Sequence, residues 1–271
     1  SPAFADMRVR ELGADGNVQL VPPRREVTIH DLLTHLGGLR YDHVHPCIDE
    51  GRTLAEFVEQ VCADPLLGHP GELWRYSESD DVLGHLIEVI SGQSFGEFLR
   101  ERIFEPLGMV DTDFHVPADK VDRLAEVYTD GEDGQLRPAT DLHGPTFTEK
   151  KNLPSGGGGL VSTTCDYLRF ALAMLNDGEL DGARILGPKT IELMADNHLP
   201  PGHPPLDINH RGYGLGVAVT GRPGEHQALG SFGEFGWGGA AGTNVWIDPV
   251  EDMITMFMIQ HRPTGRFKLS E

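Results

Sequence analysis

The order of two hydrophobic patterns along the chain is the feature that most restricts its fold. Apolar residues first recur at helical spacing, in segments that cover 28–39, 53–67, 79–92, 94–109, 164–178 and 187–199. Segments rich in β-branched and aromatic residues come last, at 213–221, 242–249 and 253–260. Spacings of three and four residues place side chains on one face of a helix, whereas β-branched runs suit strands. Helices followed by a group of antiparallel strands predict an α+β fold.

Local signals mark the ends of the predicted helices. Thr28 can cap the first helix, with Asp31 three residues on as its acidic partner. Pro65 stops the second helix, Gly92 ends the third and Pro106 closes the fourth. The apolar stripes that we expect to be buried are Ile29, Leu32, Leu33 and Leu36 in the first helix, and Leu83, Leu86, Ile87 and Ile90 in the third.

The charge balance excludes some classes of partner. The 271 residues include 22 Lys and Arg against 42 Asp and Glu, which gives a formal net charge of −20. Such a surface repels phosphate backbones and anionic lipid headgroups, so we expect neither nucleic acid nor a membrane as partner. No apolar run approaches the roughly 18 residues of a membrane span. A homo-oligomer is left open.

Cysteine usage indicates the compartment. Cys47, Cys62 and Cys165 are odd in number and widely spaced, so no disulfide framework follows. We expect Cys62 and Cys165, which lie in helical segments, to be buried as small apolar side chains. No signal peptide opens the chain, and a reducing, cytoplasmic location is the expectation.

Four blocks of sequence agree in order and spacing with a known family. They are TIHDLLTHLGGL from residue 28, YSESDDVLGHLIEVISGQSFGEFLRERIFEPLGMVDTDF from 76, GGGGLVSTTCDYLRFALAMLNDGELDGARILGPKTIELM from 156 and GEFGWGGAAGTNVWIDP from 233. Over about residues 27–260 the chain resembles the serine β-lactamase-related superfamily. Within it, the chain looks most like the esterase branch close to class C β-lactamases, often called family VIII esterases.

The resemblance implies a fold similar to that of penicillin-binding proteins, with an antiparallel sheet, helices on its faces and an all-helical region beside it. We expect residues 1–271 to form a single, incomplete catalytic domain of this kind, its N-terminal part missing. Residues 28–155 form the mainly helical region, and residues 156–271 the sheet-plus-helix region. Within the first, residues 115–155 are polar and predict a long surface excursion with short strands.

The resemblance also implies acyl transfer through a covalent acyl-serine, carried by three motifs. The third motif, on an edge strand that lines the site, falls on Trp237-Gly238-Gly239. The glycines allow the backbone to approach an acyl group, and the backbone N–H of Ala240 serves as one oxyanion donor. Because Trp237 replaces a carboxylate-binding lysine with an apolar wall, neutral esters are favoured over lactams.

The second motif falls on Tyr76-Ser77-Glu78, just before a helix. Tyr76 is the expected general base, which requires cationic groups that stabilise its phenolate. Glu78 stands where lactamases have Asn. Two interpretations of Glu78 stay open: contact with the substrate pocket, or compensation of the helix dipole. Asp80 and Asp81, in the first turn of the same helix, are expected to compensate that dipole.

The first motif, Ser-x-x-Lys, is absent from the chain. The residues three positions before each lysine are Pro117, Phe147, Thr148, Leu186 and Gly265. In the family this motif lies upstream of the region where the chain starts. We therefore expect the nucleophile to lie outside these residues, and the chain alone to be inactive.

Two other patterns carry weaker alternatives. His43, His45, Cys47 and Asp49 stand close together and faintly resemble a zinc-hydrolase motif, although a polar loop is the preferred interpretation and no metal or other cofactor is expected. Ser155 and Gly156–Gly159 could suggest a phosphate loop, but no Gly-Lys follows. We expect this run to allow close approach of the backbone beside the active site.

The sequence thus predicts a serine hydrolase, an esterase that acts on small-molecule, short-chain acyl esters. Tyr76 is the catalytic base, and the oxyanion site and substrate pocket comprise Glu78, Trp237, Gly238, Gly239 and Ala240. β-Lactamase or D-amino-acid peptidase activity is one alternative. A non-catalytic, ligand-binding homologue is another.

Overall fold

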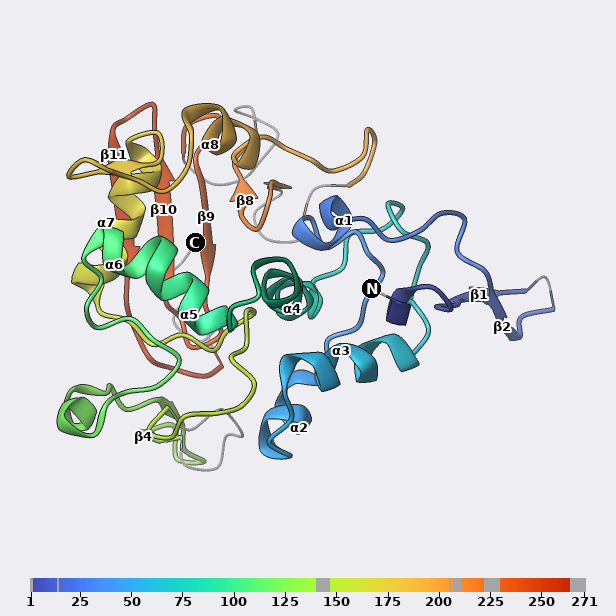
Figure 1. Cartoon of the computed structure of the whole chain (residues 1–271), viewed down its shortest axis with the longest axis horizontal. Helices are drawn as coiled ribbons and strands as arrows, with labels where there is room; N and C mark the ends of the chain where they lie inside the picture. The colour runs from blue at the N-terminus through green and yellow to red at the C-terminus, as the bar shows by residue number, and fades with distance from the viewer. Residues whose placement is uncertain are drawn as a thin grey trace. The chain divides into compact units, whose positions relative to one another are not determined.

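The computed structural model describes residues 2–13, 15–139, 147–204, 206, 211–221 and 230–263 (Figure 1). The chain divides into two compact units. The first comprises residues 1–99, 149–160 and 198–204, and the second comprises 100–148, 161–197 and 205–271. Residues 100–148, which the sequence placed with the helical region, thus group with the sheet.

The first unit is mainly helical, with one small hairpin. Val9 pairs with Val21 and Leu12 with Val18 in an antiparallel two-stranded ladder. Its elements are η1 (Pro2–Phe4), β1 (Val9–Leu12), β2 (Val18–Val21), α1 (Ile29–Leu33), α2 (Val44–Asp49), α3 (Leu54–Ala63), α4 (Ser79–Ser91) and α5 (Phe95–Leu99).

Helix α1 begins as the sequence predicts and ends earlier. Thr28 and Asp31 form the expected capping box, in which each side chain bonds the other's backbone N–H. The helix ends at Leu33, because His35 adopts a left-handed backbone conformation with φ 53°. The predicted stripe is therefore wrong in part: Leu36 is buried but Ile29 is 53% exposed.

Helix α4 ends at Gly92 as predicted, but its buried face differs from the predicted stripe. Gly92 has φ 73° and closes the helix in the left-handed conformation. Ile90 is 73% exposed. The buried residues Ser79, Asp81, Val82 and Gly84 lie in the first half of the helix. The stripe was wrong because polar side chains, which apolar periodicity ignores, occupy the buried face.

The second unit holds the main sheet. Its helical elements are η2 (Arg100–Phe104, a π-helical turn), α6 (Glu105–Leu107), η3 (Ala118–Arg123), α7 (Thr164–Leu175) and α8 (Pro188–Met194). Its strands are β3 (Tyr128–Asp130), β4 (Leu136–Pro138), β5 (Glu179–Leu180), β6 (Ala183–Arg184), β7 (Gly212–Tyr213), β8 (Ala218–Val219), β9 (Phe235–Gly238), β10 (Asn244–Asp248) and β11 (Met253–Phe257). The short strands β3 and β4 agree with the short strands predicted within residues 115–155; residues 140–146 of that stretch lie outside the described residues.

Pro106 does not close the fourth predicted helix. It lies in the short helix α6, directly after the π-helical turn η2, so the helical conformation continues past the proline. Gly108, with φ 66°, ends that helix instead. Similarly, α7 ends at Leu175, before the predicted Gly178.

A five-stranded antiparallel sheet organises the second unit, in the order β11-β10-β9-β8-β7. Figure 1 shows α7 lying across β10 and β11. The buried core joins α7, α8 and the strands through Ala171, Met174, Ile191, Val219, Phe235, Val245 and Ile247. Apolar burial of this kind stabilises the sheet by about 25 cal/mol per Å² of apolar surface.

No helix in the described ranges is long and apolar enough to cross a membrane.

Candidate functional site

Tyr76 lies in the extended segment between α3 and α4. Its half-buried ring packs among three other rings, with centroid distances of 4.7 Å to His35, 5.4 Å to Tyr41 and 6.5 Å to Trp74. Such tilted aromatic contacts fix the plane of a ring as well as its position. The first unit therefore holds Tyr76 in a defined orientation.

Glu78 is fully buried and binds a different helix from the one it precedes. Its carboxylate accepts hydrogen bonds from the backbone N–H groups of His43 and Val44, the latter at 2.7 Å, at the start of α2. The His43 Nδ1 lies 2.9 Å from the second oxygen. The carboxylate thus caps α2, which is neither of the two interpretations that the sequence left open.

Asp80 and Asp81 follow at the start of α4 and form an acidic pair, of which Asp81 is buried and Asp80 is half-buried. Burial raises the pKa of Asp80 to about 7, and the neighbouring Asp81 adds to the shift. Burial likewise raises the pKa of Asp81 to about 6, against the lowering effect of its hydrogen bond from Ser155. The sequence suggested only dipole compensation for both residues, since nothing local to them signals burial.

The glycine-rich segment packs against this pair, as the sequence predicts. The Ser155 hydroxyl donates to Asp81 Oδ1 at 2.5 Å, and the Gly157 N–H lies 3.4 Å from the same oxygen. A Cβ on Gly156 would stand 2.3 Å from the backbone oxygen of Asp80. The prediction of a close backbone approach is confirmed, and only glycine fits at position 156.

The third motif lies on β9, which is not an edge strand. β9 pairs with β10 on one side and with β8 on the other. The two-residue strand β8 pairs only with Phe235 and Gly236, so its ladder ends before Trp237. In the described part of the chain no further residue extends this ladder, so the β8 side of β9 is open there.

The residues after Trp237 are exposed and form a tight turn. Gly239 N–H donates to Thr243 O at 2.7 Å, whereas the N–H of Ala240 donates to no acceptor among the described residues. The half-buried Trp237 ring meets Tyr213 edge-on, with centroids 5.4 Å apart. The structure therefore places an exposed backbone donor next to a fixed indole, within one unit.

A buried ion pair, which the sequence did not predict, holds the start of β9. The Glu234 carboxylate accepts from the Thr220 hydroxyl at 2.9 Å and lies 3.5 Å from the Arg211 guanidinium. That guanidinium stacks 3.4 Å above the Trp246 ring. Burial lowers the pKa of Arg211, and Glu234 opposes that shift.

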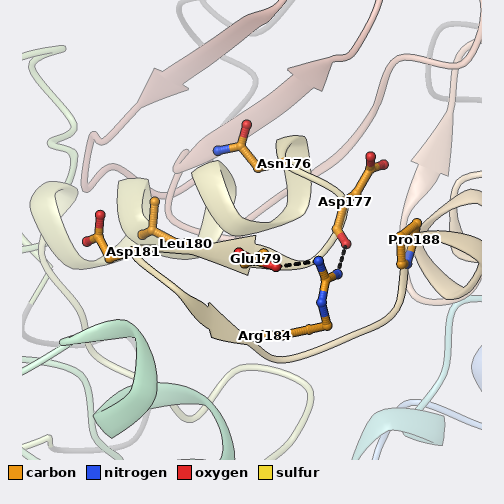
Figure 2. Close-up of a pocket in the computed structure, with 7 residues that line it drawn as sticks. All are labelled: Asn176, Asp177, Glu179, Leu180, Asp181, Arg184 and Pro188. Carbon is orange, nitrogen blue, oxygen red and sulfur yellow. Dashed lines mark hydrogen bonds and ion pairs between the residues drawn. The ribbon is translucent and has the colours of Figure 1, made fainter.

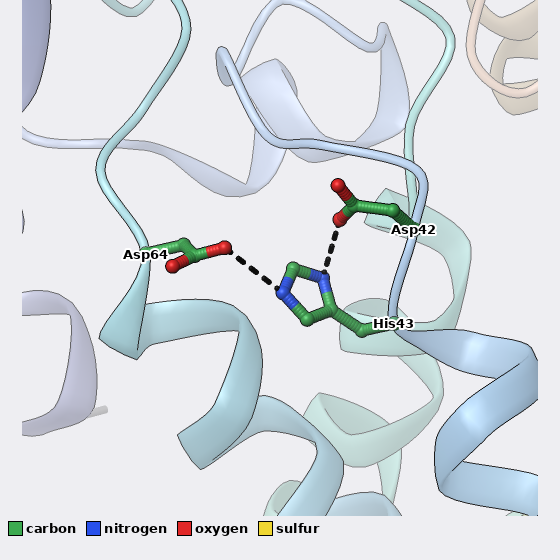
Figure 3. Close-up of side chains that lie close together, drawn as sticks. All are labelled: Asp42, His43 and Asp64. Carbon is green, nitrogen blue, oxygen red and sulfur yellow. Dashed lines mark hydrogen bonds and ion pairs between the residues drawn. The ribbon is translucent and has the colours of Figure 1, made fainter.

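The predicted zinc residues are not brought together. Within the described part of the chain, the only group of three possible metal ligands is Asp42, His43 and Asp64. Figure 3 shows the His43 ring between the two carboxylates, with 3.0 Å from Nδ1 to Asp42 and 3.1 Å from Nε2 to Asp64. Arg40 neutralises the same carboxylates. Together with Arg40, the group forms a network of ion pairs.

The cysteines differ from the prediction. Cys62 is half-buried and Cys165 is exposed. Cys165 lies in the first turn of α7 on the side away from the core, which helical context alone does not reveal.

An open depression of about 480 Å³ lies beside the β5–β6 hairpin. Figure 2 shows one of its lining residues, Arg184, bonded to Glu179 and to the backbone oxygen of Asp177. None of the sequence-predicted site residues lines it.

Comparison with known proteins decides the family. The model of the family described as Beta-lactamase matches residues 17–270. The chain belongs to the β-lactamase family. Solved structures agree on the fold: the unliganded simvastatin synthase LovD from Aspergillus terreus, as its selenomethionyl derivative, has a TM-score of 0.76 at 26% identity, over 97% of this chain and 70% of that one. EstCE1, a hydrolase with promiscuous acyltransferase activity, also has a TM-score of 0.76 at 26% identity, over 96% and 71%.

Curated relatives in the β-lactamase family include enzymes of acyl chemistry. The lovastatin esterase of Penicillium rubens is 29% identical over 88% of this chain and 65% of its own length. Protein Rv1367c of Mycobacterium tuberculosis is 35% identical over 89% and 64%. The chain thus spans a little under two thirds of the length of these relatives.

Proposed function

We propose that the protein is a serine hydrolase that cleaves small, neutral, short-chain acyl esters through an acyl-serine intermediate. The observation that supports this best is the open end of β9. There, an exposed backbone donor at Ala240 follows two glycines and an indole. Backbone N–H groups fixed in advance stabilise the oxyanion of acyl transfer.

Trp237 favours an ester over a lactam antibiotic in this proposal. The indole supplies apolar surface and no positive charge, so it gains nothing from a carboxylate on the substrate. Its edge-on contact with Tyr213 helps to keep the ring in place. The β-lactamase and D-amino-acid peptidase alternatives would both benefit from a cation at this position.

Tyr76 is the proposed general base, and the nucleophile is a serine of a Ser-x-x-Lys motif that these 271 residues do not contain. The Tyr76 phenolate accepts the proton of the serine hydroxyl as the serine attacks the ester carbonyl, and becomes a neutral phenol. It returns that proton to the leaving alkoxide, and water then releases the acid by the reverse sequence. Glu78 supports this role indirectly by anchoring the segment that follows Tyr76 to α2.

Intact mass spectrometry of the purified full-length protein, with and without a fluorophosphonate, tests the nucleophile. A single adduct on a serine of Ser-x-x-Lys supports the proposal. An adduct on a serine within residues 1–271 contradicts it.

Ester hydrolysis by Tyr76→Phe tests the base. We expect a loss of roughly 100-fold or more in kcat. Tyr41→Phe is the matched control, because its ring lies beside Tyr76 at 5.4 Å. Equal activity of the two variants would remove Tyr76 from the mechanism.

Acyl transfer to an alcohol is the second candidate function. The names of LovD and EstCE1 favour it, since a synthase and a promiscuous acyltransferase share this fold. The same acyl-serine intermediate serves both reactions, with an alcohol in place of water. Product analysis with a short-chain ester and an added alcohol distinguishes them: a new ester indicates transfer, and free acid alone indicates hydrolysis.

A further inference from the structure

His35 is a buried histidine with an unusual backbone. Its side chain is completely buried in the first unit. Its φ of 53° lies in the left-handed region, which L-residues with a Cβ adopt rarely. Backbones of this kind persist where the surrounding contacts require them, and they concentrate near functional sites.

Four consecutive residues, 74–77, are arranged around His35. The Trp74 ring meets the imidazole edge-on at 6.2 Å, and the Tyr76 ring lies against it at 4.7 Å. Between them, the Arg75 N–H donates to the backbone oxygen of His35 at 3.0 Å. The Ser77 N–H donates to His35 Nδ1 at 3.3 Å. His35 thus binds the residues on both sides of Tyr76: its carbonyl accepts from Arg75, and its ring accepts from Ser77.

The hydrogen bond from Ser77 fixes the tautomer of the ring. A backbone N–H can only donate, so Nδ1 must accept. Burial lowers the pKa of His35 to about 4, so the ring is neutral at pH 7. A neutral imidazole that accepts at Nδ1 carries its proton on Nε2.

The other ring nitrogen faces Asp80. His35 Nε2 lies 3.6 Å from Asp80 Oδ2, which is too long for a hydrogen bond and close enough for an electrostatic contact. Since Asp80 begins α4, this contact relates the imidazole to the helix that follows Tyr76.

We infer that His35 is the positioning residue for Tyr76, and that its left-handed backbone, its fixed tautomer and its contact with Asp80 together set the orientation of the Tyr76 ring. This inference rests on the proposed function only in that it assigns a catalytic use to that orientation. The positioning residue His35 and its partner Asp80 lie outside the three family motifs.

Ser77, His35 and Asp80 together also form a Ser–His–Asp arrangement. Ser77 Oγ lies 3.1 Å from His35 Nδ1 and 2.8 Å from Ser79 Oγ. Ser77 is only 2% exposed, so a substrate carbonyl cannot reach its hydroxyl. The arrangement therefore orders the segment and does not supply a nucleophile.

Variants of the full-length protein test the inference. His35→Asn keeps a residue that tolerates the left-handed backbone and removes the ring. We expect its kcat on a p-nitrophenyl ester to fall roughly 10- to 100-fold while KM stays within about twofold. The matched control is His69→Asn, another buried histidine of the first unit, which bonds Glu11 and the backbone of Arg24. It should leave both constants near those of the unchanged protein.

NMR supplies a readout that does not depend on activity. In the unchanged protein, nitrogen shifts should show the proton of His35 on Nε2. The Tyr76 ring signal, assigned by its loss in Tyr76→Phe, should move in His35→Asn and stay in His69→Asn. A proton on Nδ1, or an unmoved Tyr76 signal in His35→Asn, would overturn the inference.

Two further results separate the possible failures. If His35→Asn does not fold, Asp80→Asn replaces it, with a smaller loss of kcat and a shifted Nε2–H signal expected; an unchanged signal contradicts the inference. If Tyr76→Phe retains full activity while His35→Asn moves the Tyr76 signal, the proposed function fails and the positioning stands. A fluorophosphonate adduct on Ser77 would contradict the inference and indicate that Ser77, His35 and Asp80 act as a catalytic triad.

Discussion

The two predicted motifs are held by different kinds of interaction. Buried polar side chains fix the chain around Tyr76: His35, Glu78 and Asp81 are each bonded to backbone or hydroxyl partners. Around Trp237, backbone pairing between β9 and β10 fixes the chain. The strength of a buried polar contact depends on the protonation state and identity of its partners, whereas a β-ladder requires a fixed distance between its strands. The Tyr76 motif should therefore be sensitive to changes of charge, and the Trp237 motif to added carbon atoms.

Glu78→Ala should give the largest effect in the first unit. It leaves two backbone N–H groups at the start of α2 and the His43 ring without their buried acceptor. Loss of one partner of a buried charged contact costs about 3–5 kcal/mol. Urea unfolding measures this loss, and Glu59→Ala, at an exposed position of α3, is the control. A cost below 1 kcal/mol would remove the contrast between the motifs.

Gly236→Ala should give the largest effect in the second unit. The new Cβ would stand 2.0 Å from the Val245 oxygen and 2.9 Å from the Trp246 Cα, so β9 and β10 must separate. Overpacking of this kind costs about 1–3 kcal/mol or more. Thermal and urea unfolding, together with loss of amide exchange protection in β10, would measure it. Protection equal to that of the unchanged protein would show that the strands can adjust.

Asp81→Asn should change the pH dependence of stability. The folded pKa of about 6 lies above the ordinary value of 3.8 for an aspartate, so this carboxyl stabilises the fold fully below pH 3.8 and loses that contribution as pH rises through 6. A neutral amide does not titrate, and it can still accept from Ser155. We therefore expect the variant to gain on the order of 2 kcal/mol relative to the unchanged protein between pH 4 and pH 8. Urea unfolding of both proteins at pH 4 and pH 8 tests the sign of this change. The same difference in unfolding free energy at both pH values would contradict the prediction.

Gly238→Ala should have the smallest effect on stability and a selective effect on activity. Its Cβ would stand 3.4 Å from Asn244 Nδ2, a contact that a small side-chain shift relieves. We expect a cost below about 1 kcal/mol. Because the position is exposed beyond the end of β8, the methyl group should obstruct an acyl group there. The kcat/KM values of a short and a branched acyl ester would show it, and equal ratios in both proteins would argue against an acyl group at this strand.

Local signals in the sequence predicted the local parts of the fold. Thr28 caps α1 together with Asp31, three residues away, so the pattern contains the whole interaction. The end of α1 was not predictable, because it depends on the conformation that distant contacts impose on His35. The buried face of α4 was missed for a similar reason: it is polar, and its partners come from elsewhere in the chain.

The candidate site divides in the same way. The motif residues Tyr76 and Trp237 could be found by their resemblance to a family. The bond from Ser155 to Asp81 spans 74 positions, and that from Ser77 to His35 spans 42. Without the fold, such distant pairs have no signature in a single sequence, since neither partner is unusual by itself.

The left-handed backbone at His35 also limits how this position can change by mutation. Asparagine and aspartate tolerate that conformation, and each is one nucleotide away from the histidine codons. Drift at this position would therefore pass first through chains that still fold and have lost the imidazole beside Tyr76. In a lineage in which selection no longer maintained the tyrosine, we expect His35 and Tyr76 to be substituted together, while Gly37 and Gly38 are retained.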